Sequence, residues 1–180
     1  MAAPSSRPLL GKPKKRSSIL ISACLAGINC NHRGENELLG SLKPLMSQFT
    51  VVAVCPEVLG GLPVPREAAE ISGGEGKDVL DGTARVVTRS GRDVTAKFVL
   101  GAREALKIAA IYRPVAAILR SNSPSCGYGR IYDGSFKKRL RRGSGLLAAL
   151  LKRDRIKVYT EKTLAIAKRK LEKNSGYMIQ

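Results

Sequence analysis

The sequence is poor in the side chains that build several common kinds of functional site. Its 180 residues include one histidine, His32, and no tryptophan, and aromatic residues make up only 4%. A metal site built from several histidines is therefore excluded, and an aromatic surface for stacking single-stranded nucleic acid is weakly supported. There is also no Cys-x-x-Cys pair, which argues against a zinc ribbon or a thioredoxin-type redox motif.

Long hydrophobic segments are missing as well. No apolar run approaches the roughly 18 residues that a membrane-spanning helix needs, and the N-terminus lacks the uninterrupted apolar stretch of a secretory signal. The four cysteines are too few for a fold held together by disulfides. We therefore expect a cytoplasmic protein with reduced thiols and no membrane contact, as a monomer or a small homo-oligomer.

Acidic residues are scarce beside basic ones. The chain has 32 Lys and Arg against 14 Asp and Glu, a net charge of +18. Such a charge describes partners rather than fold, and nucleic acid is the first polyanion to consider. The alternative, a charge that serves only solubility, stays open.

The chain divides into a tail and one domain. Residues 1–18 are rich in Pro, Ser, Lys and Arg, which predicts a flexible basic tail. Residues 19–175 are predicted to form a single α/β domain, because their length and the hydrophobic content of 43% suit one ordinary core.

Apolar runs alternate with helical patterns along this domain. Strands are predicted at residues 19–23, 50–54, 115–119 and 156–159, and helices at residues 36–48 and 95–111, behind an N-cap at Ser144, and after a cap at Thr160. A hairpin is predicted around Ser90 and Gly91, and residues 60–76 read as a long loop. The alternation predicts a three-layer, Rossmann-like α/β fold with a mostly parallel sheet, helices on both faces and a small β-hairpin.

Three cysteines follow three of the predicted strands. Cys24 and Cys55 come directly after the first two strands, and Cys126 lies seven residues after the third. Ligands of such sheets bind at the carboxyl ends of the strands, so we expect these thiols to converge at one edge. Soft thiolates suit a soft metal.

The cysteine count leaves two kinds of metal site open. A 4Fe–4S cluster is usually held by four cysteines, so three would leave one iron free to bind substrate as a Lewis acid. Cys30 is either a core residue or a fourth ligand that closes the site. If Cys30 closes the site, the metal would be structural, and the protein would be a non-catalytic RNA-binding module.

Four polar residues near these cysteines are candidates for catalysis or substrate binding. Glu57 can move protons, and its alternative is a surface loop acid. Ser123 can donate a hydrogen bond to substrate, or it can cap its loop at residues 121–134. The guanidinium of Arg66 offers several hydrogen-bond donors in one plane, which makes Arg66 a candidate for substrate binding. Ser125 is a second candidate substrate-binding residue.

Four segments together resemble the thiouracil desulfidase family. They are ISACLAGINC at residues 21–30, VCPEVLGGLPVPREAAEI at residues 54–71, SNSPSCG at residues 121–127 and IYDGSF at residues 131–136. The likeness runs from about residue 19 to residue 151. Relatives often have Cys-Arg-Tyr-Asp-Gly where this chain has Cys-Asn-His-Arg-Gly from Cys30 to Gly34, and lysines where it has Arg120 and Asn122.

The resemblance implies an enzyme with a 4Fe–4S cluster held by Cys24, Cys55 and Cys126. It further implies that the open iron takes the sulfur of a thiocarbonyl, that water replaces this sulfur at carbon, and that sulfide leaves. Glu57 and Ser123 would be the catalytic partners, with Glu57 as base or acid. Some members of the family act on free 2- or 4-thiouracil and others on 4-thiouridine in tRNA, so the implied substrate is a thiolated pyrimidine, free or within tRNA.

Overall fold

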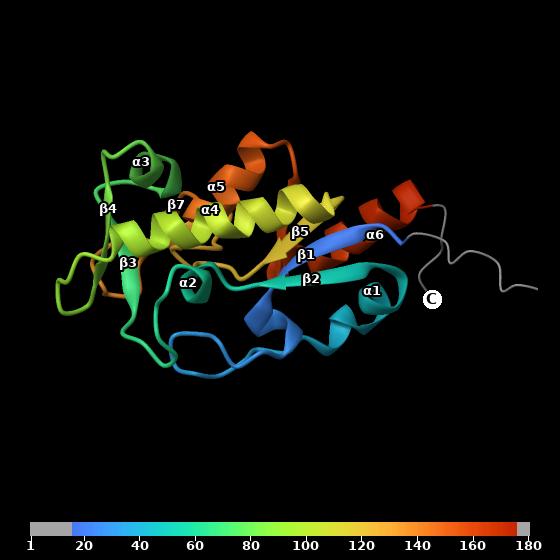
Figure 1. Ribbon diagram of the computed structural model, residues 1–180, viewed down its shortest axis with the longest axis horizontal. Helices are drawn as coiled ribbons and strands as arrows, with labels where there is room; N and C mark the ends of the chain where they lie inside the picture. The colour runs from blue at the N-terminus through green and yellow to red at the C-terminus, as the bar shows by residue number, and fades with distance from the viewer. Residues whose placement is uncertain (1–15, 176–180) are drawn as a thin grey trace, which may run out of the picture.

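A central sheet of four parallel strands organises the chain. The computed structural model describes residues 16–175. The strands stand in the order β2 (Thr50–Val54), β1 (Ser18–Ser22), β5 (Ala116–Leu119) and β8 (Lys157–Thr160), and all three pairings are parallel (Figure 1). The predicted α/β fold with a parallel sheet is confirmed.

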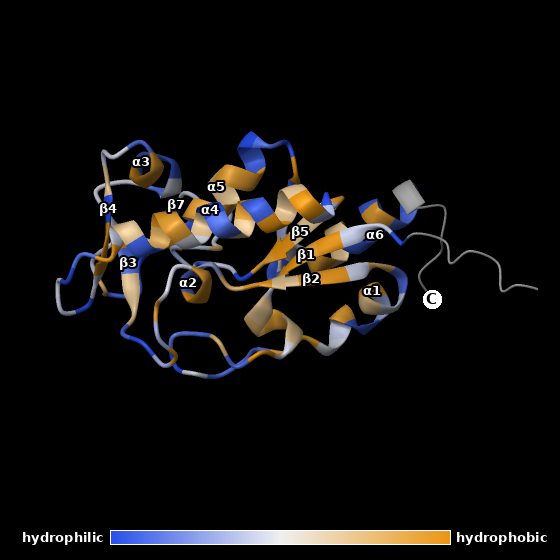
Figure 2. Cartoon of the chain, viewed as in Figure 1, coloured by the Kyte–Doolittle hydropathy of each residue, from blue (hydrophilic) through white to orange (hydrophobic). Residues whose placement is uncertain are grey.

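The central strands are buried on both faces, as parallel strands require. Leu20 packs with α3 (Gly76–Leu80), α4 (Thr95–Tyr112) and α5 (Leu146–Arg153). Its neighbours in β1, Ile19 and Ile21, face the opposite core with α1 (Lys43–Gln48) and α6 (Leu164–Ser175). Figure 2 shows hydrophobic residues concentrated along β1 and β5 between these two helical layers.

Two small antiparallel pairs lie outside the central sheet. β3 (Ala69–Ser72) pairs with β4 (Arg85–Thr88), and β6 (Arg130–Tyr132) pairs with β7 (Leu140–Arg142). The predicted long loop at residues 60–76 is therefore wrong in its last part, where four residues without a β-branched run gain a strand by pairing with β4. The turn at Ser90 and Gly91 is present, but its second arm makes only the single bridge Val87–Asp93 before α4 begins.

The helix predicted at residues 36–48 is wrong in its first half. Helical structure begins as a 3-10 turn at Gly40–Leu42 and continues as α1. Before it, the Asn36 side chain accepts the N–H of Leu38 at 3.2 Å and donates to Asn29 Oδ1 at 2.6 Å. Such local side-chain bonds compete with helix formation.

The other helix predictions fare better. The structure confirms the helix at residues 95–111 as α4. Thr160 precedes a 3-10 turn, Glu161–Thr163, that leads into α6, and its N–H donates to Thr163 Oγ1 at 2.9 Å. The N-cap of α5 is Gly145 rather than the predicted Ser144, whose N–H donates to Glu75 Oε2 at 2.8 Å.

The first strand begins inside the segment predicted as a tail. Ser18 is buried in β1, and its hydroxyl donates to the carbonyl oxygen of Tyr112 at 2.7 Å. Residues 1–15 lie outside the described part of the chain. Within residues 16–175, no helix combines the length and the hydrophobicity of a membrane span.

Two glycines fix the short helix that follows β2. This helix, α2 (Pro56–Leu59), packs against α4 so closely that a Cβ on Gly101 would lie 1.7 Å from the carbonyl oxygen of Pro56. A Cβ on Gly60 would lie 2.0 Å from the carbonyl oxygen of Lys97. Only glycine allows this approach, which sets the position of Cys55 and Glu57 at the end of the sheet.

Candidate active site

A cleft of about 570 Å³ opens at the carboxyl edge of the central sheet. Cys24, Cys55 and Cys126 all line it, each supplied by the segment after a different strand. Cys24 lies in the 3-10 turn Ala23–Ala26 that follows β1, and Cys55 is the N-cap of α2. The parallel direction of the strands thus brings together three cysteines that are far apart in the sequence, as predicted.

The loop that carries Cys126 is folded around Ser123. The Ser123 hydroxyl oxygen accepts the N–H groups of Ser125 at 3.1 Å and Cys126 at 3.2 Å, and its carbonyl oxygen accepts the Gly127 N–H at 2.8 Å. Ser123 therefore caps the loop, which was one of its two predicted roles. It also lines the cleft, with its own hydroxyl proton still available as a donor.

Burial disfavours the charged form of these thiols. It raises the pKa of Cys24 to about 11, with smaller effects from Glu37 and Cys55. It also raises the pKa of Cys126 well above its ordinary value, and the neighbouring Cys55 and Cys24 add to this while a hydrogen bond with Ser22 opposes it. Thiols in such surroundings become thiolates when a positive metal centre compensates their charge.

Cys30 lies beside this group. It lines the same cleft, and its carbonyl oxygen accepts the thiol of Cys55 at 3.6 Å. Burial and the neighbouring Cys55 raise the pKa of Cys30 to about 12. Because Cys30 also packs in the core beside α1, the structure is compatible with both predicted roles, core residue and fourth ligand.

Glu57 is held at both carboxylate oxygens. Oε2 pairs with Arg66 Nε at 2.7 Å, and Oε1 accepts the Ser125 hydroxyl at 3.2 Å. Arg66 Nη1 donates to the carbonyl oxygen of Pro63 at 3.2 Å, and Nη2 donates to that of Cys30 at 2.9 Å. Every nitrogen of the guanidinium is thus engaged by the protein, and only 5% of the Arg66 side chain is exposed.

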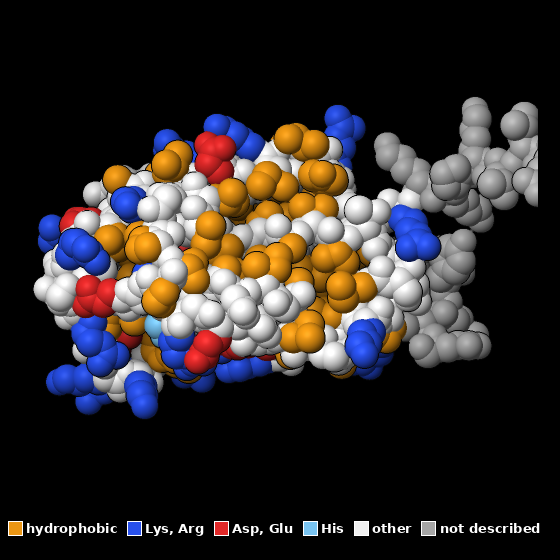
Figure 3. Space-filling model, turned by 60° about the horizontal axis from the view of Figure 1, so that its bottom comes forward, with side chains coloured by type: hydrophobic (Ala, Val, Ile, Leu, Met, Phe, Trp, Pro, Cys, Tyr) orange, Lys and Arg blue, Asp and Glu red, His pale blue; other side chains and the backbone are white. Residues whose placement is uncertain are grey.

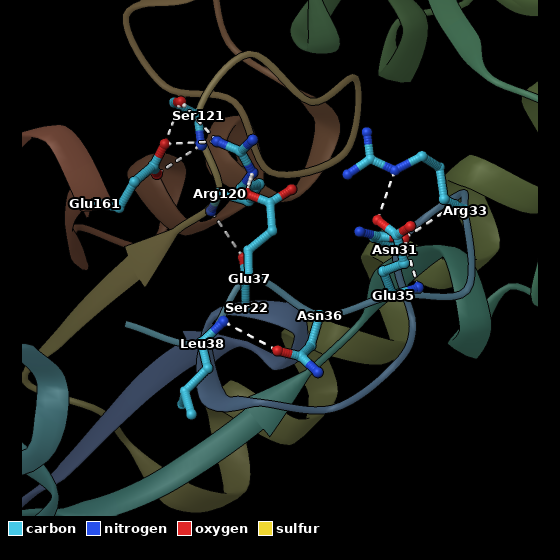
Figure 4. A network of polar contacts seen from close by, with 10 residues as sticks. All are labelled: Ser22, Asn31, Arg33, Glu35, Asn36, Glu37, Leu38, Arg120, Ser121 and Glu161. Carbon is cyan, nitrogen blue, oxygen red and sulfur yellow. Dashed lines mark hydrogen bonds and ion pairs between the residues drawn. The ribbon is translucent and has the colours of Figure 1, made fainter. Parts of the chain in front are cut away.

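A second network joins the ends of three segments around Arg120 (Figure 4). Arg120 Nε pairs with Glu37 at 2.6 Å and Nη1 with Glu161 at 2.7 Å, while Glu161 also accepts the Ser121 N–H at 2.9 Å. The Arg120 N–H donates to Ser22 Oγ at 2.9 Å, which ties the end of β5 to the end of β1. The planar guanidinium of Arg120 therefore bridges two carboxylates at once.

Sequence reasoning missed several residues around the cleft. Glu161 directly follows β8, so the strand-end rule that located the cysteines would have located it too. Glu37, Glu70, Arg89 and Phe136 carry no such signal, because long-range pairing brings them to the cleft. All but Glu161 belong to the cleft lining.

A site for a lone metal ion is absent from the part of the chain that the structure describes. Within residues 16–175, no three His, Cys, Asp or Glu side chains are grouped to hold a metal ion. Cys24, Cys55 and Cys126 line the cleft as separate thiols.

Comparison with known proteins assigns this architecture to a family. A sequence model described as 2-thiouracil desulfurase matches residues 19–163. The chain belongs to this family. The match spans all four motifs that suggested the resemblance, which is thereby confirmed.

Two relatives of this family member support the assignment. The uncharacterized protein YbbK of Bacillus subtilis (strain 168) is 47% identical over 146 residues, which is 81% of this chain and 97% of YbbK. The solved structure of TudS, a 4Fe–4S-dependent thiouracil desulfidase, is 39% identical with a TM-score of 0.72, and the match covers 83% of this chain and 94% of TudS.

Replacing Arg66 with alanine is expected to reduce the free energy of unfolding by about 3 kcal/mol, because the Glu57 side chain, which is only 16% exposed, would lose its counter-charge. The matched control is Arg33→Ala, which removes the surface pair with Glu35, whose side chains are 59% and 57% exposed. That change is expected to cost less than about 1 kcal/mol. Urea unfolding under anaerobic conditions measures both, and equal losses would contradict the structural role of Arg66.

Proposed function

We propose that this protein is a 4Fe–4S-dependent desulfidase that converts the C=S group of a thiolated pyrimidine to C=O and releases sulfide. The observation that carries the proposal is the convergence of Cys24, Cys55 and Cys126 beside the oriented carboxylate of Glu57. The family assignment and the likeness to TudS support the same reaction.

The donor set of the cleft fits a cluster bound by three protein thiolates. Cys24, Cys55 and Cys126 are soft donors that leave one iron without a protein ligand, in agreement with the preference of iron–sulfur clusters for thiolates. When bound, the cluster would supply a Lewis-acidic iron that attracts the substrate sulfur and makes the adjacent carbon easier to attack.

Glu57 is assigned the role of general base. The Glu57 carboxylate accepts hydrogen bonds at both oxygens, from Arg66 at 2.7 Å and from Ser125 at 3.2 Å. Its two hydrogen bonds orient it at the wall of the cleft, where it can take a proton from the attacking water. Arg66 and Ser125, which we expected to bind substrate, are assigned to positioning this carboxylate.

Ser123 is assigned the role of a donor to substrate. Its oxygen already accepts two backbone N–H groups, so its hydroxyl proton is directed away from them. Because the side chain lines the cleft, this proton can stabilise negative charge that develops on the substrate.

Anaerobically reconstituted protein is expected to carry about four irons per chain. Cys24→Ala, Cys55→Ala and Cys126→Ala should each lose most of this iron and the brown colour, whereas Cys30→Ala should keep both. Iron analysis and absorption spectra decide the outcome. Loss of iron in the Cys30 variant would favour the alternative, a closed structural site in a non-catalytic RNA-binding protein.

Glu57→Gln is expected to keep its iron and to release sulfide from 2-thiouracil and 4-thiouracil at least 10²-fold more slowly, roughly the contribution of a general base. Glutamine preserves the shape of the side chain but cannot take up the proton. Sulfide and uracil are measured side by side for both substrates. No sulfide from the unmodified protein, or an unchanged rate in the variant, would contradict the proposed reaction.

A thiolated base within tRNA is the second candidate substrate. Arg89 and Lys138 line the cleft, and the net charge is +18. Figure 3 shows Lys and Arg side chains gathered toward the end of the molecule that carries β3 and β4. Basic groups at the mouth of the cleft favour a substrate that carries phosphates.

Turnover of thiolated tRNA is expected to fall steeply between 50 and 200 mM salt, by roughly 10³-fold if several phosphates are bound. Turnover of free thiouracil should stay nearly constant over the same range, because the free base has no phosphate to contact. Parallel sulfide assays test this. An equal response of both substrates would show that the basic surface does not capture substrate.

A further inference from the structure

One aromatic ring in the cleft is held in an unusual backbone conformation. Phe136 has a φ of 57°, in the left-handed region that residues other than glycine rarely adopt. Such a conformation persists only where the surrounding structure enforces it, and it is often found at binding sites.

Glu70 enforces the conformation of this loop. Its side chain lies on β3 and the residue is only 8% exposed. Oε2 accepts the N–H of Gly134 at 2.9 Å and that of Phe136 at 3.1 Å. A buried carboxylate with two backbone donors is a strong anchor, so the position of Phe136 is set before any ligand arrives.

Arg89 completes the arrangement. Its guanidinium lies 5.8 Å from the centroid of the Phe136 ring, within the distance of a cation–π contact. The Arg89 N–H donates to the carbonyl oxygen of Ala68 at 3.0 Å. Both side chains line the cleft that contains the three cysteines.

This pair is tied to the proposed general base by one short segment. Arg66 holds Glu57, Ala68 holds the backbone of Arg89, and Glu70 holds the Phe136 loop. The Cα atoms of residues 66 and 70 are separated by at most about 14 Å of extended chain. One short segment therefore connects the residue that anchors the Glu57 carboxylate with the residue that anchors the Phe136 loop.

We propose that Phe136 and Arg89 form the stacking subsite for the pyrimidine ring of the substrate, which rests on the proposed desulfidase function. An aromatic face and a guanidinium plane are the two protein groups on which nucleobases stack. Stacking leaves the edge of the base free, so the thiocarbonyl can point toward the cysteines while Glu57 approaches the same carbon. The subsite would serve a free base and a base within RNA alike.

The test measures binding of uracil, the reaction product, to the reconstituted protein by calorimetry or ligand-observed NMR. Phe136→Leu is expected to weaken binding roughly 10-fold at unchanged iron content, while Phe136→Tyr stays within about 2-fold of the parent. In turnover, KM for 4-thiouracil should rise with little change in kcat, because stacking is equally strong before and during reaction. Tyr112→Leu, at the far end of α4, removes an exposed aromatic outside the cleft and should change nothing.

A second variant guards against misfolding of the Phe136 loop. Arg89 is exposed, so Arg89→Gln should fold normally and weaken uracil binding in the same direction. Unchanged uracil binding and KM in both Phe136→Leu and Arg89→Gln would overturn the subsite while leaving the desulfidase function intact. Uracil binding that depends on Phe136 in a protein that releases no sulfide would support the subsite and refute the reaction.

Discussion

The parallel direction of the central strands is the constraint on which the site depends. β1, β2 and β5 run the same way, so the segments that follow them meet at one edge of the sheet. Each of these segments supplies a cysteine. The close packing of α2 against α4 at Gly60 and Gly101 fixes the position of Cys55. Changing the direction or register of any of these strands would move a cysteine away from the cleft.

Ion pairs hold several side chains around the cleft in fixed positions. Glu57 is held by Arg66, and Arg120 is held between Glu37 and Glu161. The two arginines act as cross-links between segments that are distant in the sequence, so the cleft is largely formed before substrate binds. Preorganised charges of this kind stabilise a reaction without reorganisation at the moment of bond breaking.

Much of this arrangement could be predicted, because it depends on local patterns. Apolar runs followed by cysteine predicted three parallel strands and the convergence of three cysteines at one edge of the sheet. The position of Glu57 two residues after Cys55 predicted a carboxylate at the same edge. The rest depends on distant pairing. The short strand β3 has no β-branched run to mark it and exists through β4, and Glu70 and Phe136 meet only because the chain returns there. No helix forms before Gly40, although apolar residues recur there at helical spacing. The bond from the Leu38 N–H to the Asn36 side chain competes with helix formation in this segment.

In the proposed reaction, Cys24, Cys55 and Cys126 would hold the cluster and leave one iron without a protein ligand for the substrate sulfur. ⁵⁷Fe Mössbauer spectra of the reconstituted protein, recorded without and with 4-thiouracil, test it most directly, with Glu57→Gln used to slow turnover. The account predicts that about one iron in four changes its isomer shift on addition of the thiolated base while the other irons stay as they were. A spectrum in which all irons are equivalent and unaffected by the thiolated base would contradict it.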